Sequence, residues 1–562
     1  MMIYSKKAHK NRLTDNKKSI LAIILVSFIF IIPQLITKNM VVSSDTIFHF
    51  NRFFDTSEQI RSGNFEYFIS LYGFQQSGRI VNAFYSPLIA YLQGSLVLIS
   101  KNWFFYQVLS NLILFIVSGC NMYVFLLRGH LNQKKSCVGA ILYMCTYSVL
   151  YWSTRQGFSS WGAAIMPLCL TIIFESLEEN KVPKFKLGFF TALLFQIHIL
   201  SAFILILIYI PVFISVFIKS DSKLQFLLAI FKEVILFLLL TLNVWATYYT
   251  ITQGNKLIAP FVNHTMSLNT INRNSYYWIL NPISLVLILM TVLGVTLIKW
   301  KTYTFEKRLL FLIMLFFLVL STSIIPWSYL IEQDISIAKL IQFPFRFFVP
   351  VTIISIYLFL QFSNSNKLNS LFALVGIFQV VILMFVSLNP WNGDENYTSS
   401  GPKTIMTTSN DQSIKASFYS KDKEEALKLV QKTTPDYLPS YGENVTDTYK
   451  LYGNKIIYAN EFFEKSIEKS KLIITMKESN KESIEFPIII YTNTILSTNG
   501  KKLSKSNYVL SEIGTPIINK DYLKNNQVEI EFNHESLDMF IYLTIILWII
   551  SLLKSLYDLY EH

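Results

Sequence analysis

Asp45, His49 and Arg52 are the residues whose types and spacing point first to chemistry. A helix turns about 100° per residue, so side chains at i, i+4 and i+7 share one face. A carboxylate there could take a proton from a hydroxyl group or hold a divalent metal ion beside a phosphate. The guanidinium could pair with that carboxylate or bind a phosphate through two hydrogen bonds. The alternative is an acid that only begins a helix, followed by solvated polar residues.

The stretch around these residues predicts an amphipathic helix lying on a membrane surface. Ser43 or Ser44 could cap its N-terminus, and Asp45 would lie in the first turn, where a negative charge suits the helix dipole. Gly63 is the expected end of the helix. The apolar members of the stretch lie mostly on the other side: Ile47, Phe50 and Phe54.

The composition places this helix in a membrane protein. The 562-residue chain is 52% hydrophobic and only 15% charged, whereas soluble domains carry about 25% charged residues. Many apolar runs reach the roughly 20 residues needed to cross a bilayer. The formal net charge of +13 lies largely in short loops, where Lys and Arg set orientation, so it does not indicate nucleic-acid binding. The four cysteines form no disulfide or zinc pattern.

Charge and hydropathy predict about twelve spans with both termini in the cytoplasm. The basic residues 1–18 favour a cytoplasmic N-terminus, and Ile20–Ile36 is the first span. Phe84–Ile99 is apolar enough to be a span, but that assignment would place several later basic clusters outside. We therefore interpret it as a half-buried or re-entrant helix within one long external loop, residues 37–102. Leu187–Ile218 is too long for one span and is predicted as two short helices.

The balance of polar and apolar residues changes after residue 388 and predicts three parts. Residues 1–388 form a transmembrane module, residues 389–535 an external, mostly β domain, and residues 536–562 the last span with a cytoplasmic tail. A helical pattern over Asp422–Lys432 precedes several short β-type runs, and Asn499-Gly500 is a turn between strands. The runs are Leu472–Met476, Ile484–Tyr491, Asn507–Leu510 and Val528–Phe532.

Basic side chains predicted outside the membrane form a second group of candidates. Lys and Arg are usually concentrated in the cytoplasmic loops of a membrane protein, so cations on the outer surface suggest an anionic ligand. Arg346 would enter a span from the outside, where it could reach headgroups or a lipid phosphate. His198 lies in an apolar run, where polar residues are functional candidates and a structural histidine is the alternative. The other external bases are Arg79, Arg155, Lys256, His264 and Arg273.

Several familiar catalytic patterns do not occur in the sequence. It contains no phosphate-binding GxxxxGK[ST] loop, no HExxH helix, no GxSxG turn and no CxxC pair. An ATP-driven or zinc-dependent mechanism therefore has no support at this level.

An Asp directly after the first span, in a long external loop, resembles the GT-C class of integral membrane glycosyltransferases. In that class, which includes protein O-mannosyltransferases and the aminoarabinose transferases of lipid A, a Pro-Pro-Leu-type segment follows the Asp in the same loop. Tyr85-Ser86-Pro87-Leu88 takes that place here.

Over nearly its whole length the chain is similar to bacterial multi-spanning proteins labelled 6-pyruvoyl-tetrahydropterin synthase-related membrane protein, although nothing in it resembles a soluble pterin synthase. The sequence departs from the usual pattern at Ser44 for Gly, Ser86 for Pro and Phe345 for Trp, and none of these changes removes a charge. The motifs that carry the likeness are Asp45-x-x-x-His49-x-x-Arg52, Gly63, Gly78, Tyr85-x-Pro87-Leu88, Gln342-Phe343-Pro344-x-Arg346 and Tyr437-Leu438-Pro439.

The resemblance implies transfer of a sugar from a polyprenyl-phosphate carrier to a cell-envelope acceptor on the outer face of a bacterial cell membrane. By that analogy Asp45 is the catalytic base or a metal-binding acid, with a divalent metal ion as the cofactor to test. The analogy does not assign the other polar candidates. On charge grounds we expect them to bind substrate or phosphate; they are His49, Arg52, Arg79, His198, Arg273 and Arg346.

Two other functions stay open at this point. A non-enzymatic scaffold for envelope assembly would use the β domain to bind a partner, and Asp45→Asn would be silent in it. A transporter or flippase for a lipid-linked glycan would need polar residues in mid-membrane helices and matched halves. His198 and the Lys232/Glu233 pair favour transport, but the two halves of the chain show no repeat.

Overall fold

Helices long enough to cross a membrane dominate the computed structural model, which describes residues 2–43, 45–389, 403–442, 445–477 and 481–561. Within these residues seven helices are long and apolar enough to span, or eight if the bent pair α10 (Lys223–Leu240) and α11 (Leu242–Gly254) counts as one span. The protein is therefore mostly helical with seven or eight candidate spans. The seven are Asn16–Thr37, Trp103–Arg128, Ser159–Glu179, Ile199–Lys219, Pro344–Phe362, Asn366–Leu388 and Leu537–Tyr557.

This number is lower than the twelve expected because several apolar runs are broken into shorter helices. The run 137–152 divides into α5 (Gln133–Met144) and α6 (Tyr147–Arg155). The run 187–218 divides at His198 into two helices, as predicted, but the second has 21 residues and is not short. Hydropathy averages over such breaks, because a polar or proline residue between two apolar stretches changes the mean very little.

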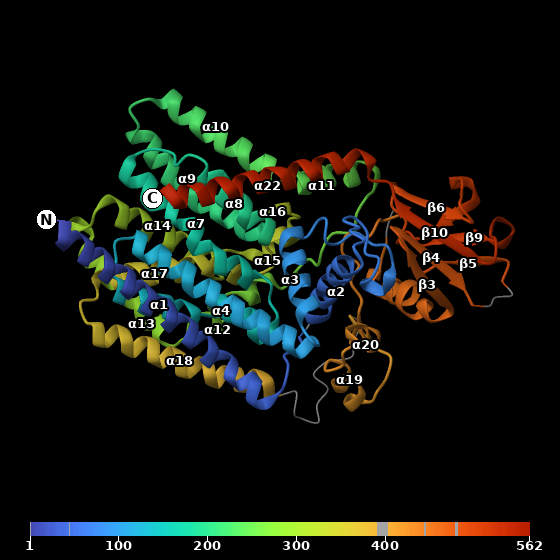
Figure 1. Ribbon diagram of the computed structural model, residues 1–562, viewed down its shortest axis with the longest axis horizontal. Coiled ribbons are helices and arrows are strands. Elements are labelled where there is room, and N and C mark those ends of the chain that lie inside the picture. Colours follow the sequence, from blue (N-terminus) through green and yellow to red (C-terminus); the bar gives the residue numbers. More distant parts are fainter. Residues whose placement is uncertain (1, 44, 390–402, 443–444, 478–480, 562) are drawn as a thin grey trace. The chain divides into compact units, whose positions relative to one another are not determined.

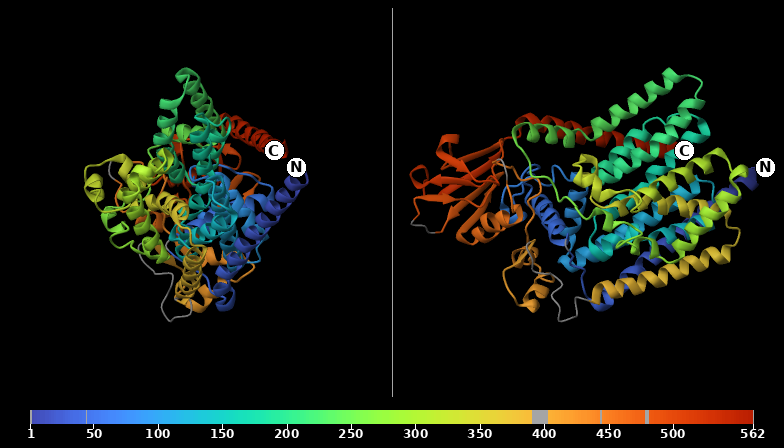
Figure 2. Two further views of the ribbon diagram at one scale, coloured as in Figure 1. Left: turned by 90° about the vertical axis from the view of Figure 1, so that its left-hand side faces the viewer. Right: turned by 180° about the vertical axis from the view of Figure 1, so that it is seen from behind.

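The chain divides into two units. The first, called the helical unit, comprises Met1–Val41, Val108–Phe237 and Val262–Glu395. Its helix α17 has buried side chains all round over residues 348–360, as expected of a helix in a core. In the same unit α1 and α18 lie side by side (Figures 1 and 2). Its elements are α1 (Met2–Thr37), α4 (Trp103–Arg128), α5, α6, α7 (Ser159–Glu179), α8 (Lys186–Ile197), α9 (Ile199–Lys219), α10, η2 (Met266–Asn269), α12 (Tyr277–Leu280), α13 (Ser284–Ile298), η3 (Trp300–Thr302), α14 (Phe305–Leu320), α15 (Trp327–Glu332), α16 (Ser336–Ile341), η4 (Pro344–Phe347), α17 (Phe348–Phe362) and α18 (Asn366–Leu388).

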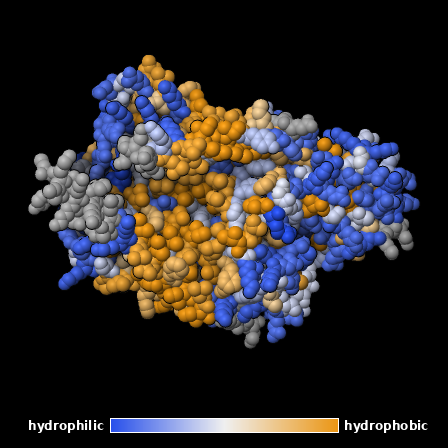
Figure 3. Space-filling model, viewed as in Figure 1, coloured by the Kyte–Doolittle hydropathy of each residue, from blue (hydrophilic) through white to orange (hydrophobic). Residues whose placement is uncertain are grey.

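The surface of the long helices is apolar. Hydrophobic residues cover much of the helical face visible in Figure 3, whereas hydrophilic residues cover the strands near the C-terminus. Many large apolar side chains on these helices are exposed, among them Ile218, Ile298 and Phe378. Because a soluble monomer rarely leaves so much apolar surface in water, this surface supports a membrane location.

The second unit, called the loop–sheet unit, comprises Val42–Gln107, Leu238–Phe261 and Asn396–His562. Its strands are all antiparallel and form sheets ordered β3-β4-β10-β6-β7, β5-β9-β8 and β1-β2. Its elements are α2 (Thr46–Ser62), η1 (Phe74–Gln76), α3 (Pro87–Ile99), α11, β1 (Thr404–Met406), α19 (Asp411–Ser417), α20 (Lys423–Leu429), β2 (Val430–Lys432), α21 (Thr448–Tyr452), η6 (Gly453–Tyr458), η7 (Ala459–Phe462), β3 (Phe463–Glu468), β4 (Lys471–Met476), β5 (Ser483–Glu485), β6 (Thr494–Thr498), β7 (Lys501–Lys502), η8 (Lys505–Asn507), β8 (Tyr508–Leu510), β9 (Pro516–Asn519), η9 (Lys520–Tyr522), β10 (Gln527–Phe532) and α22 (Glu535–Glu561).

The prediction of a β region before a final apolar helix is confirmed. Strands β4, β8 and β10 match predicted runs, while 484–491 is a strand only at its start, in β5. Between β6 and β7, Asn499 and Gly500 both have positive φ, at 48° and 72°, which is the conformation of a tight hairpin turn. The other strands, β1, β2, β3, β6, β7 and β9, were not predicted, because they are short or lack a clear alternation of polar and apolar residues. The helix predicted over Asp422–Lys432 ends as α20 at Leu429, and its last residues form β2.

The core of the loop–sheet unit is built from residues far apart in sequence. Phe68, Ile69, Leu71 and Ile80, from the loop after α2, are buried in one cluster with side chains of β4, β6 and β10. The ammonium of Lys465 on β3 donates to the carbonyls of residues 75, 76 and 487 at 2.8–3.1 Å. The first long loop and the β region thus share one hydrophobic core rather than forming two separate cores.

The apolar segment 84–99 forms the short helix α3, whose 13 residues span about 20 Å. This is less than the roughly 30 Å thickness of a bilayer core, so α3 is too short to cross one alone. It packs against α2, and Thr56 donates to the carbonyl of Ala90 at 2.8 Å. A Cβ at Gly94 would lie 2.2 Å from the Thr56 hydroxyl, so only glycine permits this close packing.

Candidate functional site

Helix α2 is enclosed by protein. Its residues 46–57 are all buried, including His49 and Arg52, which corrects the expectation of a helix exposed on a membrane surface. Ile47, Phe50 and Phe54 are buried on one side, but neighbouring segments also cover the polar side. Phe50 stacks on Trp103 at 4.1 Å with nearly parallel rings. A periodic pattern shows which face is apolar, not whether other segments cover the polar face.

The structure confirms the predicted C-terminal end of α2 but not the predicted capping of its N-terminus. Gly63 ends the helix with a φ of 69°, as predicted. Asp45 occupies the N-cap position rather than the first turn, and its side chain makes no capping hydrogen bond. The backbone N–H of Ser43 instead donates to the Thr46 hydroxyl at 2.8 Å, and Ser44 lies outside the described residues.

Asp45 remains accessible at the start of this buried helix. Its side chain is 54% exposed, and its Oδ1 pairs with the ammonium of Lys432 at 3.1 Å. Lys432 ends β2 and is itself only 12% exposed. A cation that is largely withdrawn from water holds its charge close to a reacting group and is less screened than a surface lysine. Asp45 is therefore a fixed but solvent-accessible carboxylate.

A second carboxylate, that of Asp436, belongs to the same neighbourhood. Burial raises the pKa of Asp436, Arg79 and Lys432 oppose that rise, and the charge of Asp45 adds to it. Arg79 is completely buried and donates to Thr434 Oγ1 at 2.8 Å and to the carbonyl of Asp436 at 2.5 Å. Arg79 thus holds the segment that presents Asp436 and also supplies a countercharge to its carboxylate.

Lys403 and Tyr449 complete this group of charges. The Lys403 ammonium lies over the rings of Phe261 and Tyr449, at 4.4 and 5.0 Å from their centroids. Burial, together with the charges of Asp436 and Asp45, raises the pKa of the Tyr449 phenol to about 12. The group defined as the Asp45 cluster is Asp45, Arg79, Lys403, Lys432, Asp436 and Tyr449.

Arg52 and His49 of α2 hold the segment before α3 in place. Arg52 donates to Asn82 Oδ1 at 3.1 Å and to the carbonyl of Tyr85, and its guanidinium lies 4.4 Å from the centroid of the Tyr85 ring. Burial lowers the pKa of Arg52 to about 10. Its other end contacts His49 Nδ1 at 3.4 Å, and since a guanidinium only donates, that nitrogen accepts. Arg52 therefore ties the segment before α3 to α2.

Asp55 supports the loop on another face of α2. Its carboxylate is buried and accepts hydrogen bonds from the backbone N–H groups of Tyr72 and Gly73 at 2.8 and 3.0 Å, and from Gln59 at 2.9 Å. Burial raises the pKa of Asp55 to about 6. A Cβ at Gly73 would lie 2.4 Å from the carbonyl oxygen of Asn51, so glycine is required for this close approach.

The residues of the Asp45 cluster do not fit a divalent metal ion. Within the described part of the chain, no group of three or more His, Cys, Asp or Glu side chains is placed to hold a metal. Calcium and magnesium sites use several oxygen ligands, whereas Asp45 and Asp436 are accompanied by three cationic side chains. The cluster is therefore suited to an anionic ligand and not to a divalent cation.

The other predicted site residues belong to the helical unit. His198 is the N-cap of α9, where its Nδ1 accepts from the backbone N–H of Ser201 at 3.2 Å. Arg346 in η4 donates to the carbonyl of Ile341 at 3.0 Å and to Gln342 Oε1 at 3.1 Å. Arg273 is exposed in a turn after η2. His198 and Arg346 thus have local structural contacts, and the three do not form a cluster comparable to that of Asp45.

Glu233, one of the residues that favoured transport, caps a helix. Its carboxylate, which is buried on α10, accepts from the backbone N–H groups of Phe185 and, at 2.8 Å, Gly188. These groups are at the N-terminus of α8, where unpaired N–H donors favour an anion. The acid therefore has a structural partner within the helical unit.

Sequence reasoning missed Lys432, Asp436 and Lys403. Lys432 is 387 residues from Asp45 along the chain, and no local pattern reveals such a pairing. Asp436 did carry a signal, because it directly precedes the quoted Tyr437-Leu438-Pro439 motif. It is the acid nearest to that motif.

No protein-family model matches the chain, and the comparison with curated proteins also finds no match. The likeness to GT-C enzymes therefore rests on the motifs quoted above.

Proposed function

We propose that this protein is a GT-C-type membrane glycosyltransferase that moves a sugar from a polyprenyl-phosphate carrier to a cell-envelope acceptor on the outer face of a bacterial membrane. The observation that carries the proposal is the Asp45 cluster. It combines an accessible carboxylate paired with Lys432, a second acid at Asp436, and further cations at Lys403 and Arg79. Candidate spans elsewhere in the chain fit a lipid-linked donor.

The cluster can support an inverting transfer in a single displacement. Asp45 would take the proton of an acceptor hydroxyl as that oxygen attacks the anomeric carbon of the sugar. The bond from that carbon to the phosphate oxygen breaks, and its electron pair leaves with the polyprenyl phosphate. The reaction therefore forms one glycosidic bond, breaks one and transfers one proton to the carboxylate.

The cations of the cluster suit the leaving phosphate. Negative charge grows on the phosphate oxygen as the bond breaks, and a fixed cation stabilises that charge in the transition state. Lys432 and Lys403 are the two ammonium groups of the cluster. Arg79 and Arg52 are engaged in holding Asp436 and the segment before α3. We therefore assign the lysines to the phosphate and the two arginines to positioning.

Transport is less well supported than transfer. The polar residues that argued for it, His198 and Glu233, cap helices α9 and α8. A scaffold function makes a different prediction from the transferase, because it does not need the Asp45 carboxylate. The experiment below separates the two.

The test compares envelope glycopolymers by mass spectrometry in a parent strain, a deletion strain, and deletion strains complemented with wild-type or Asp45→Asn protein present at equal levels. We expect the deletion to lose a sugar that wild-type protein restores and Asp45→Asn does not. The matched control is Asp422→Asn, which changes another exposed helix N-cap carboxylate, that of α20, and should restore the sugar fully. Full restoration by Asp45→Asn would contradict the transferase and favour a scaffold.

A further inference from the structure

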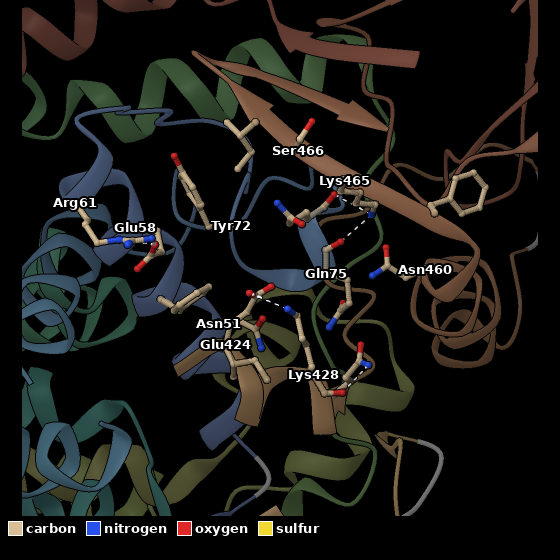
Figure 4. A pocket seen from close by; sticks show the side chains of 16 residues that line it. Asn51, Glu58, Arg61, Tyr72, Gln75, Glu424, Lys428, Asn460, Lys465 and Ser466 are labelled. Carbon is tan, nitrogen blue, oxygen red and sulfur yellow. Dashed lines mark hydrogen bonds and ion pairs between the residues drawn. The ribbon is translucent and has the colours of Figure 1, made fainter. Parts of the chain in front are cut away.

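The loop–sheet unit contains a polar pocket on a different face of α2 from the Asp45 cluster. Its volume is about 520 Å³, within the range of about 300–1,000 Å³ typical of small-ligand sites. Figure 4 shows Glu58 and Arg61 of α2 on one side, with Lys465 and Asn460 on the other. The walls come from α2, the loop at 72–76, α20 with β2, and β3 with the turn before it.

The charges of this pocket largely neutralise each other. Arg61 donates to Glu58 at 2.8 Å, and Lys428 pairs with Glu424 at 2.9 Å. The ammonium of Lys465 uses its three hydrogens on backbone carbonyls. Glu58 and Glu424 thus balance Arg61 and Lys428, and burial lowers the pKa of the remaining cation, Lys465, to about 7. Because each of the three cations already has a partner, none is left to bind a phosphate directly. The ligand that fits is uncharged.

The remaining lining groups are suited to hydroxyl groups. Amide and hydroxyl side chains can each donate and accept, as sugar hydroxyls do. Asn460 lines the pocket, and its Oδ1 has no hydrogen-bond partner among the described residues, so this oxygen keeps its capacity to accept. Phe54 and Phe463 add apolar surface for the carbon faces of a ring. The other polar lining residues include Gln75, Gln76, Gln431 and Ser466.

We propose that this pocket binds a neutral carbohydrate, and that it holds the acceptor glycan of the transfer, an assignment of role that rests on the proposed function. Strand β2 links the pocket to the Asp45 cluster, because two successive residues of this strand contribute to one site each. Gln431 lines the pocket, and Lys432 pairs with Asp45. Successive side chains of a strand point to opposite faces, so the carbohydrate pocket and the Asp45 cluster lie next to each other on the two faces of β2.

The test measures binding to the full-length protein in a detergent without a sugar headgroup. The probes are maltotriose, cellotriose, chitotriose and mannotriose at millimolar concentration, with inorganic pyrophosphate as the charged counterpart, followed by saturation-transfer NMR and titration calorimetry. Ser466→Trp fills the pocket from an exposed position on β3. Glu464→Trp adds the same side chain on the same strand, at a position that does not line the pocket.

We expect at least one trisaccharide to bind the wild-type protein and the Glu464→Trp control equally. Ser466→Trp should weaken that binding by at least about tenfold, and Asn460→Leu should weaken it by several-fold. Pyrophosphate should not compete. The proposal is overturned if none of the four trisaccharides binds, if Ser466→Trp binds like the wild type, or if pyrophosphate displaces the sugar.

The two proposals fail in distinguishable ways. Asp45→Asn should retain trisaccharide binding, because Asp45 does not line the pocket. If the pocket proposal is wrong and the transferase is right, Asp45→Asn still abolishes transfer while Ser466→Trp leaves it unchanged. If only the transferase is wrong, Ser466→Trp still loses the sugar, although Asp45→Asn leaves the envelope glycopolymers intact.

Discussion

The buried carboxylate of Asp55 makes a sharp prediction about the loop–sheet unit, because its charge and its hydrogen bonds act in opposite directions. Burial raises its pKa from an ordinary 3.8 to about 6. The folded unit therefore binds a proton more tightly than the unfolded chain does, and stability falls as pH rises through the interval between these two values. At 1.36 kcal/mol per pKa unit, the ionised group lowers stability by about 3 kcal/mol at pH 8.

Asp55→Asn removes the charge but keeps the acceptor. The amide oxygen of asparagine can still accept from the N–H groups of Tyr72 and Gly73, and Gln59 can rotate its amide to meet the new NH₂ group. We therefore expect the variant to be more stable than the wild type by up to about 3 kcal/mol at pH 8. At pH 5 the difference in stability between the variant and the wild type should be about 1.4 kcal/mol smaller than at pH 8. That change is a factor of ten in the equilibrium between the closed and the open loop.

The assay is hydrogen exchange of the amides of Tyr72 and Gly73 in detergent, comparing the variant with the wild type at each pH. Burial and the charge of Asp55 together raise the pKa of Glu66 to about 7, so Glu66 also responds to the substitution. Both proteins therefore carry Glu66→Gln, which removes that titration from the comparison. Asp55→Ala is the second variant. It leaves both N–H groups without an acceptor and should speed exchange, since each orphaned donor costs about 1–3 kcal/mol. Faster exchange in Asp55→Asn than in the wild type at pH 8 would refute the reasoning, because the charge would then be stabilising the loop.

Two further predictions concern residues that the sequence singled out. Arg79→Met should lower the free energy of unfolding by at least about 2 kcal/mol, because it leaves the buried carbonyls of Thr434 and Asp436 without their donor; an unchanged melting temperature would contradict this structural assignment. His198→Ala should lose about 1 kcal/mol from the N-terminus of α9, whereas His198→Asn should retain most of it because asparagine also caps helices. Hydrogen exchange in the first turn of α9 distinguishes the two, and an equal loss in both variants would mean that the cap is not what His198 provides.

Local features of this protein followed from the sequence alone. Gly63 ends α2 because a left-handed residue there favours glycine, and neighbouring residues suffice to indicate it. Strand β10 alternates in burial, and its residues, Gln-Val-Glu-Ile-Glu-Phe, carry the same period of two in their polarity. The abundance of long apolar runs likewise predicted a membrane protein, because crossing a bilayer places a length requirement on each segment separately.

The Asp45 cluster depended on tertiary structure. The sequence offered Asp45, but not its pairing with Lys432, which comes from a strand 387 residues away. It also presented Arg52 and Arg79 as exposed cations, whereas packing encloses both and directs them to backbone carbonyls. Helical and strand periodicity describe one segment at a time. Which faces are covered, and which charges meet, is decided by the other segments that pack against them.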